Sequence, residues 1–137
     1  MRHSHIDFRP VPRVTTFEQA LPLADHALDF PPGTLIAMIL GSAGDVTDTL
    51  VFDDGERCPI DIVESVCAHA LPDDCALVVA TNRRDCDPRE RELDDVATWE
   101  EMWTAADAHG IELREWFVLV GDLLWVPREL SDVGAEW

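Results

Sequence analysis

The stretch that decides the fold is CALVVATNRRDCDPRERELD, residues 75–94. Its first part, residues 75–81, is a short apolar run that predicts a buried strand. The chain then becomes densely polar, and its arginines, aspartates and proline predict a loop over residues 82–93. Loops at strand ends often carry functional residues, so this loop is the first candidate for a site.

Helices and strands are predicted on both sides of this stretch. The run at 34–40 is almost wholly apolar, which is typical of a central strand buried on both faces. Apolar residues at helical spacing predict one helix after Pro59 and another between the polar loop and Gly110. Further strands are predicted at 46–53, 111–121 and 123–127. The order predicts an α/β fold with a mixed β-sheet flanked by helices.

The N-terminal region is predicted to be less regular. Residues 1–14 combine prolines with scattered charges, and we expect an extended or mobile segment there, followed by one domain over 15–137. Thr15 and Glu18 have the spacing of a capping box, which starts a helix. Pro22 lies within this helix and predicts that it is short or broken, ending near Leu28.

The charge of the chain narrows the classes of function. Acidic residues outnumber basic ones 28 to 10, which gives a formal net charge of −18. Such a surface repels phosphate backbones and anionic lipids, so we expect no general nucleic-acid binding and no membrane partner. The sequence has no apolar run long enough for a transmembrane span and no apolar stretch of a signal peptide, which predicts a cytoplasmic location.

The cysteines and the N-terminal histidines do not form a recognisable metal-binding motif. The cysteines are Cys58, Cys67, Cys75 and Cys86. They lack the close spacing of zinc motifs, and free thiols are expected in a reducing cytoplasm. Cys67 falls on the apolar face of its predicted helix, which assigns it to the core. His3 and His5 would share one side of a strand, but two histidines alone do not predict a metal site.

From Thr34 to Leu130, the order of the predicted elements resembles the JAB/MPN fold, a cytidine-deaminase-like layered fold, and most closely its RadC-like bacterial branch. In that family the third strand ends in His-x-His-Pro, and a serine and a metal-binding aspartate follow. Asn82 matches the residue between the two histidines, Asp87-Pro88 match a family Asp-Pro pair, and Asp94 matches the aspartate. GIEL, residues 110–113, matches the entry to the next strand.

The family's metal-binding residues are mostly replaced in this chain. Thr81 and Arg83 stand at the two histidine positions. Arg84 stands at the proline, Arg91 at the serine, and no acid stands near residues 32–34, where the family has a glutamate. A catalytic zinc needs about three protein ligands, and arginine donates hydrogen bonds without accepting them. The resemblance therefore implies a degenerate site, with no metal and no cofactor, made of Thr81, Asn82, Arg83, Arg84 and Asp94.

An arginine is expected to take the place of the missing metal. An unpaired carboxylate is costly to bury, so we expect Arg83, or failing it Arg84 or Arg91, to pair with Asp94. The resemblance and the missing ligands together predict a pseudoenzyme: a non-catalytic RadC-like domain that binds or scaffolds proteins. Its partner is expected to be another protein or a second copy of the chain, bound through a sheet edge or a tryptophan-bearing helix.

Two other functions stay open at the level of sequence. One is a hydrolase with a rebuilt metal or thiol site, for example by convergence of His69, Asp94 and Cys86. The other is anion or nucleotide binding by the arginines of the polar loop, which are Arg83, Arg84 and Arg91.

Overall fold

The apolar run in the quoted stretch is part of β4 (Asp74–Arg83), a central strand of a mixed sheet. The computed structural model describes residues 3–53, 58–83, 94–134 and 137. The other strands are β1 (His3–His5), β2 (Leu35–Gly41), β3 (Val46–Phe52), β5 (Glu112–Val120) and β6 (Leu123–Trp125). The six strands have the order β1-β3-β2-β4-β5-β6, and β4 and β5 form the parallel pair among antiparallel ones.

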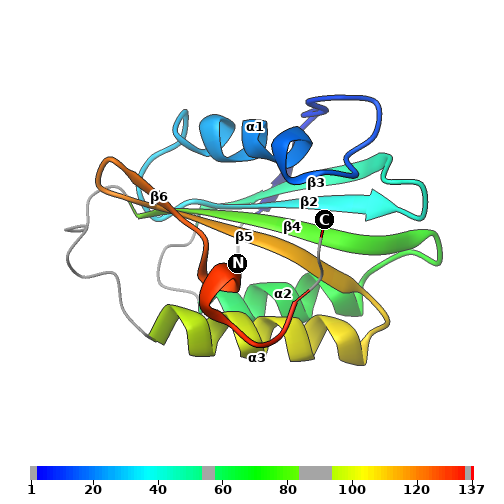
Figure 1. Ribbon diagram of the computed structural model, residues 1–137. Helices are drawn as coiled ribbons and strands as arrows, with labels where there is room; N and C mark the ends of the chain where they lie inside the picture. Colours follow the sequence, from blue (N-terminus) through cyan, green and yellow to red (C-terminus); the bar gives the residue numbers. More distant parts are fainter. Residues whose placement is uncertain (1–2, 54–57, 84–93, 135–136) are drawn as a thin grey trace.

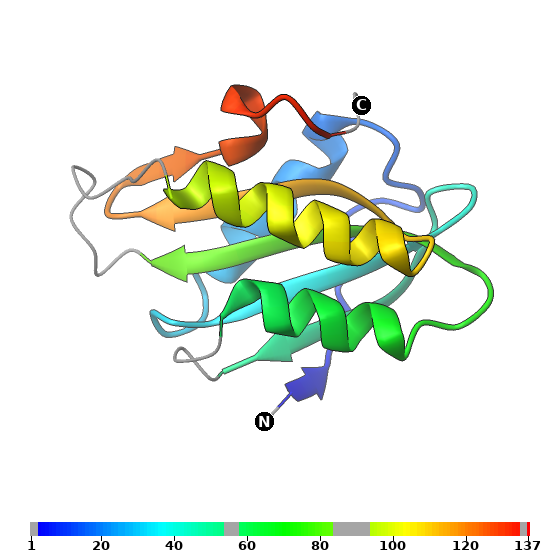
Figure 2. The ribbon, with the colours of Figure 1, turned by 90° about the horizontal axis from the view of Figure 1, so that it is seen from below.

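Helices cover both faces of the sheet. Figure 1 shows α1 (Phe17–Ala27) above the sheet, with α2 (Pro59–Ala68) and α3 (Asp94–Ala108) below it. Seen from below, α2 and α3 lie side by side (Figure 2). The predicted α/β class with a mixed, helix-flanked sheet is therefore confirmed. No helix among the described residues has the length and hydrophobicity of a membrane span.

The sheet separates two hydrophobic cores, which explains the continuous apolar runs of β2 and β4. In β2, Ile36 and Met38 pack toward α1, whereas Ala37 and Ile39 pack toward α2 and α3. Successive strand residues point to opposite faces, and both faces are covered here, so every position of β2 is buried. The same alternation in β4 directs its last residues, Thr81 to Arg83, alternately toward α3 and α1.

The start of α1 lies one residue later than predicted. Thr16, and not Thr15, is the N-cap, because its side chain accepts a hydrogen bond from the Gln19 backbone N–H at 3.2 Å. The Gln19 side chain in turn accepts from the Thr16 backbone N–H at 3.2 Å, which completes the capping box. The prediction had chosen Thr15 and Glu18, which have the same three-residue spacing.

The first helix was predicted to be short or broken at Pro22, and it is a single helix of 11 residues. The helix continues through Pro22 to Ala27, although its end near Leu28 is as predicted. A proline inside a helix costs about 3 kcal/mol because it removes a hydrogen bond and crowds the preceding turn. Leu23 and Ala24 are buried against the sheet directly after it, and this packing holds the helix together.

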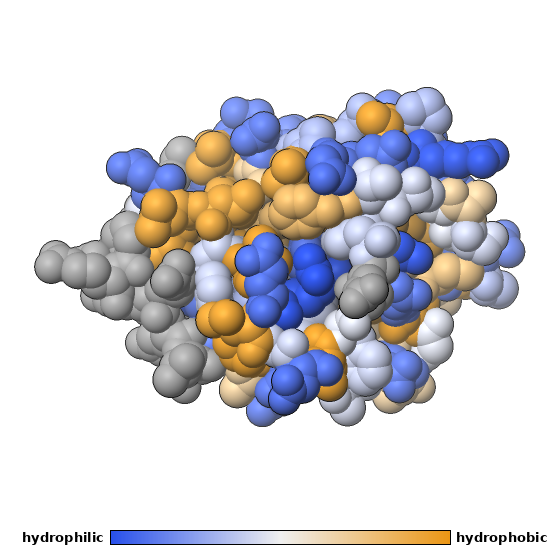
Figure 3. All heavy atoms as spheres, viewed as in Figure 1, coloured by the Kyte–Doolittle hydropathy of each residue, from blue (hydrophilic) through white to orange (hydrophobic). Residues whose placement is uncertain are grey.

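The C-terminal segment lies against the edge of β5. The 3₁₀ helix η2 (Pro127–Leu130) brings Arg128 to Glu115 of β5. Trp137 adds a hydrogen bond from its indole N–H to the same carboxylate at 3.3 Å. On the face that Figure 3 shows, hydrophobic residues gather around β6, where Leu123 and Leu124 are exposed.

Candidate functional site

The degenerate site predicted from the sequence lies at the end of β4, and its residues point to two faces. Thr81 and Arg83 face α3, as two alternating strand positions must. The Thr81 hydroxyl accepts a hydrogen bond from the Trp116 indole N–H at 2.9 Å, on the neighbouring strand. This contact is buried, so Thr81 is a partner of a core tryptophan.

Arg83 forms a two-pronged ion pair with Asp95 of α3. Its Nη1 and Nη2 donate to the two carboxylate oxygens at 3.2 and 2.7 Å. The Trp125 indole N–H donates to the same carboxylate at 2.9 Å. The Asp95 side chain is only 7 % exposed, so three donors neutralise and hydrogen-bond a buried anion. The Arg83 Nε is buried and has no hydrogen-bond partner among the described residues.

The partner of Arg83 is the residue next to the one predicted. The described partner is Asp95, which lies on the stripe of α3 that faces the sheet, whereas the expected pairing with Asp94 falls outside the described side chains. Trp99 and Met102 continue this stripe at spacings of four and three residues. Asp94 is the first residue of α3, and its side chain lies outside the described part of the structure.

Asn82 has a structural role on the opposite face. Its side-chain amide donates to the backbone carbonyls of Ala27 and Phe30 at 3.0 and 3.1 Å. Its own backbone pairs with Gly33 and Thr34. Asn82 is fully buried, so it fixes the connection between α1 and β2 to the end of β4.

Several residues of the alternative sites lie outside the described ranges, namely Arg84, Cys86 and Arg91. The described part of the rebuilt hydrolase site does not assemble. His69 precedes β4 and Asp94 follows it, so the two lie at opposite ends of a ten-residue strand, which spans about 30 Å. The described arginine of the anion-binding hypothesis, Arg83, directs its terminal nitrogens at Asp95.

The described histidines, cysteines and acidic residues do not assemble a site for metal or thiol chemistry. Within the described residues, no three His, Cys, Asp or Glu side chains come together as a possible metal site. Cys67 is buried in the core, as predicted. Burial, and secondarily the negative charge of Glu64, raises the pKa of the Cys67 thiol to about 11. This thiol therefore stays protonated and is a poor nucleophile at neutral pH.

A second candidate site is an apolar groove between α2 and the strands β1 and β3. Figure 2 shows that β1 lies beyond the edge of α2, so α2 does not reach this end of the sheet. The groove has a volume of about 530 Å³, a size typical of ligand pockets. Its apolar lining is formed by Ile39, Leu50, Phe52, Val66 and Leu71.

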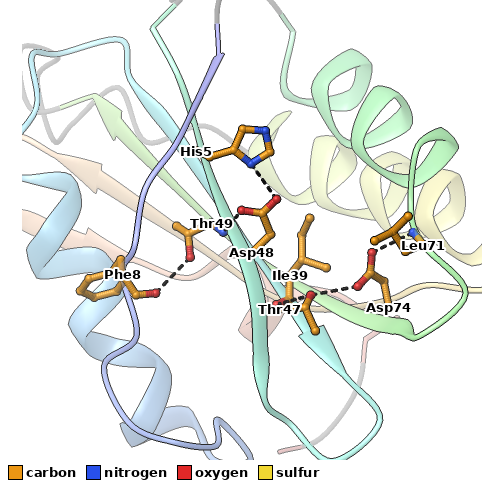
Figure 4. A network of polar contacts seen from close by, with 8 residues as sticks. All are labelled: His5, Phe8, Ile39, Thr47, Asp48, Thr49, Leu71 and Asp74. Atoms are coloured by element: carbon orange, nitrogen blue, oxygen red, sulfur yellow. Dashed lines mark hydrogen bonds and ion pairs between the residues drawn. The ribbon is translucent and has the colours of Figure 1, made fainter.

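Hydrogen-bonding side chains surround this apolar lining. They are His5, Thr47, Asp48, Ser65, His69 and Asp74. His5 of β1 and Asp48 of β3 contact each other through Nδ1 and Oδ2 at 2.7 Å (Figure 4). The other oxygen of Asp48 accepts from the Thr49 backbone N–H at 2.8 Å. These contacts tie β1 to β3 and fix the Asp48 carboxylate beside the groove.

Hydrogen bonds also fix the side chains at the other end of the groove. Thr47 donates its hydroxyl to the Asp74 carboxylate at 2.9 Å, and the Leu71 backbone N–H donates to the other oxygen at 2.9 Å (Figure 4). His69 Nδ1 lies 2.9 Å from the Ser65 carbonyl oxygen, which can only accept. The proton of a neutral His69 ring is therefore on Nδ1, and its Nε2 is an acceptor. The groove thus combines an apolar lining with hydrogen-bond acceptors at its border.

The groove was not predicted from the sequence. Its residues come from β1, β2, β3, α2, the connection from α2 to β4 and the first residue of β4, so no local motif joins them. The single sequence signal was the His-x-His spacing at residues 3–5, which predicts that His5 and His3 share one side if that segment is a strand. The segment does form β1, and His5 borders the groove.

The site can also be compared with known proteins. No protein-family model matches this chain, and searches of curated proteins and of solved structures find no significant match.

Proposed function

We propose that this chain is a non-catalytic domain of the RadC-like JAB/MPN type and acts as a protein-binding module through the groove beside α2. The observation that carries the binding role is a groove floored by the buried apolar side chains of Ile39, Leu50, Phe52 and Val66, which opens to solvent at the exposed Leu71 and is bordered by fixed polar groups. Apolar surface costs free energy when it faces water, so covering it with a partner is favourable.

Two observations support the non-catalytic part of the proposal. The order of elements that carries the resemblance begins with the strand after Thr34, and it is the order β2 to β6. At the end of β4, where the family binds its metal, Arg83 and Asp95 pair with each other. Arginine is permanently cationic, so its guanidinium opposes a metal cation at that position.

Groove binding can be tested with a neutral apolar dye, N-phenylnaphthylamine, whose fluorescence rises in apolar surroundings. We expect saturable binding to the protein and its loss in Ser65→Trp, because Ser65 lines the groove from α2 and an indole there fills it. Thr104→Trp is the matched control, since Thr104 is an exposed residue of α3 away from the groove. Equal dye binding by both variants would contradict a binding role for the groove.

The prediction that the chain holds no catalytic zinc can be tested by measuring the zinc content of the untagged protein. After zinc is added and dialysed away, elemental mass spectrometry is expected to find less than about a tenth of an equivalent, because too few ligands stand at the family's positions. About one equivalent of zinc that is lost in Asp94→Ala would contradict the proposal and favour a hydrolase.

A further inference from the structure

We infer that the occupant of the groove is a cationic, amphipathic segment of a partner protein, with apolar side chains in the groove and lysines or arginines at its border. This inference rests on the proposed function and adds the chemistry of the partner. Charge, hydrogen bonding, exposure and geometry each bear on it.

The charge of the groove is negative. Asp48 and Asp74 line it, and no lysine or arginine does among the described residues. The chain as a whole carries a formal net charge of −18, so the surrounding field has the same sign. A cationic partner is attracted by both the local carboxylates and the overall field, which raises its association rate and selects against anionic partners.

The hydrogen-bonding groups of the border match a donor-rich partner. A carboxylate can accept about four hydrogen bonds. Each oxygen of Asp48 and of Asp74 makes one of the hydrogen bonds described above. These carboxylates therefore keep acceptor capacity, and the Nε2 of a neutral His69 ring is a further acceptor. Lysine and arginine bring only donors, and arginine can bind a carboxylate with two parallel hydrogen bonds.

An exposed leucine extends the apolar surface out of the groove. Leu71 lines the groove, yet its exposed fraction is 69 %, the highest among the exposed large hydrophobic residues of the described chain. A small ligand within the groove would leave much of Leu71 in water, whereas a polypeptide lying along the groove would cover it. The groove runs between a helix and a strand edge, which suits a helix laid in with its apolar face down.

A second copy of this chain fits the groove less well than a basic segment does. Two surfaces with a formal charge of −18 repel each other. Among the described residues, most arginines are also engaged, since Arg83, Arg114 and Arg128 each pair with an acidic residue. Charge complementarity therefore favours a basic partner over self-association.

The test uses three fluorescent peptides with leucines at positions i, i+3, i+4 and i+7 and with lysine, glutamine or glutamate elsewhere. We expect the lysine peptide to bind at least about tenfold more tightly than the glutamine peptide and the glutamate peptide to bind weakest. Binding of the lysine peptide should weaken when salt is raised, because salt screens the attraction.

Matched variants locate the binding. Leu71→Ser is expected to lower the affinity for the lysine peptide at least about fivefold, because it truncates an apolar side chain that anchors the peptide. Leu130→Ser should not weaken it, because Leu130 is similarly exposed, at 64 %, but lies in η2 at the opposite edge of the sheet. Asp48→Asn should lower the affinity for the lysine peptide and leave the affinity for the glutamine peptide unchanged. Asp122→Asn, in the β5–β6 turn, should change neither affinity.

The outcomes separate this inference from the proposed function. Equal affinity for the three peptides, or equal effects of Leu71→Ser and Leu130→Ser on that affinity, would overturn the inference of a cationic partner. The proposed binding role of the groove would still be supported if dye binding is lost in Ser65→Trp. Concentration-dependent dimerisation that Leu71→Ser abolishes would overturn it in favour of a second copy. Failure of both the peptides and the dye to bind would overturn the inference and the proposed function together.

Discussion

A single aspartate organises the end of β4. Asp95 accepts hydrogen bonds from the guanidinium of Arg83 and from the indole of Trp125, and its carboxylate is almost fully buried. Burying a carboxylate is costly unless charged and hydrogen-bonding partners compensate it. The three donors supply this compensation, and they join β4, α3 and β6 at one point.

Asp95→Asn is expected to lower the free energy of unfolding by about 2–4 kcal/mol, because it leaves a partly buried guanidinium without its anion. The lower part of this range applies if water reaches Arg83, whose side chain is 34 % exposed. Urea denaturation followed by tryptophan fluorescence measures the change. Asp107→Asn, at an exposed position of the same helix, is the control and should stay within about 0.5 kcal/mol of the original protein. Equal values for the two variants would show that the ion pair does not stabilise the fold.

The sequence predicted this cluster only in part. The alignment with the JAB/MPN family placed an arginine at the end of a strand and an aspartate at the start of the next helix, and the structure has both. It selected Asp94 because the family's aspartate aligns there. The helical spacing of Asp95, Trp99 and Met102 was present in the sequence and points to Asp95 instead. The acceptors of Asn82 were beyond prediction, because they are backbone atoms of a distant connection.

At the level of elements, hydrophobic patterning predicted the central strands well and the edges poorly. β2 and β4 are buried on both faces, so their apolar runs are unambiguous. β1 has only three residues and owes its place to pairing with β3 and to the contact of His5 with Asp48. These contacts join residues more than forty positions apart, and no local pattern in the sequence reports them.

β5 carries a buried ion pair at its edge. A shift in its pairing with β4, between Leu77 and Val78, turns Glu115 toward the face that α1 covers. Arg128 of η2 contacts both oxygens of Glu115 at 2.8–3.1 Å. Burial raises the pKa of Glu115 above its usual value, and the hydrogen bonds and charge of Arg128 oppose this rise only in part.

This raised pKa gives a pH dependence opposite to that of an ordinary paired carboxylate. The folded state holds the Glu115 proton more tightly than the unfolded state does. The resulting stabilisation is complete at a pH below the pKa that Glu115 has in the unfolded chain. It is lost as the pH rises through the higher pKa that Glu115 has in the folded protein. The difference in unfolding free energy between the original protein and Glu115→Gln should therefore fall as pH rises from about 4 to about 8. Urea denaturation at each pH measures it. A difference that grows with pH would mean that Arg128 outweighs burial.

The whole molecule places its two candidate sites at different ends of the sheet. The Arg83–Asp95 cluster closes the end of β4, whereas the groove lies beside β3, near the start of β4. The Asp95 carboxylate is compensated within the cluster, whereas the groove presents the exposed Leu71 and carboxylates at its border. This contrast is why the proposed partner surface is the groove and not the charged loop that the sequence pointed to first.

The net charge of the molecule should limit its stability at low salt. With 28 acidic and 10 basic residues, repulsion among carboxylates opposes the folded state more than the ion pairs favour it. Raising NaCl from about 0.01 to about 0.15 M shortens the screening length from about 30 to about 8 Å, which weakens this long-range repulsion. The buried pairs at Asp95 and Glu115 are screened less, because they lie out of water.

We therefore expect the melting temperature to rise by about 3–5 °C over this range, the shift that about 1 kcal/mol causes in a chain of this size. Differential scanning calorimetry measures it, and KCl should act like NaCl because screening depends on ionic strength. A melting temperature that falls with salt would mean that exposed ion pairs outweigh the repulsion. In that case the excess of carboxylates would be locally compensated, and the attraction of a basic partner to the groove would depend on Asp48 and Asp74 alone.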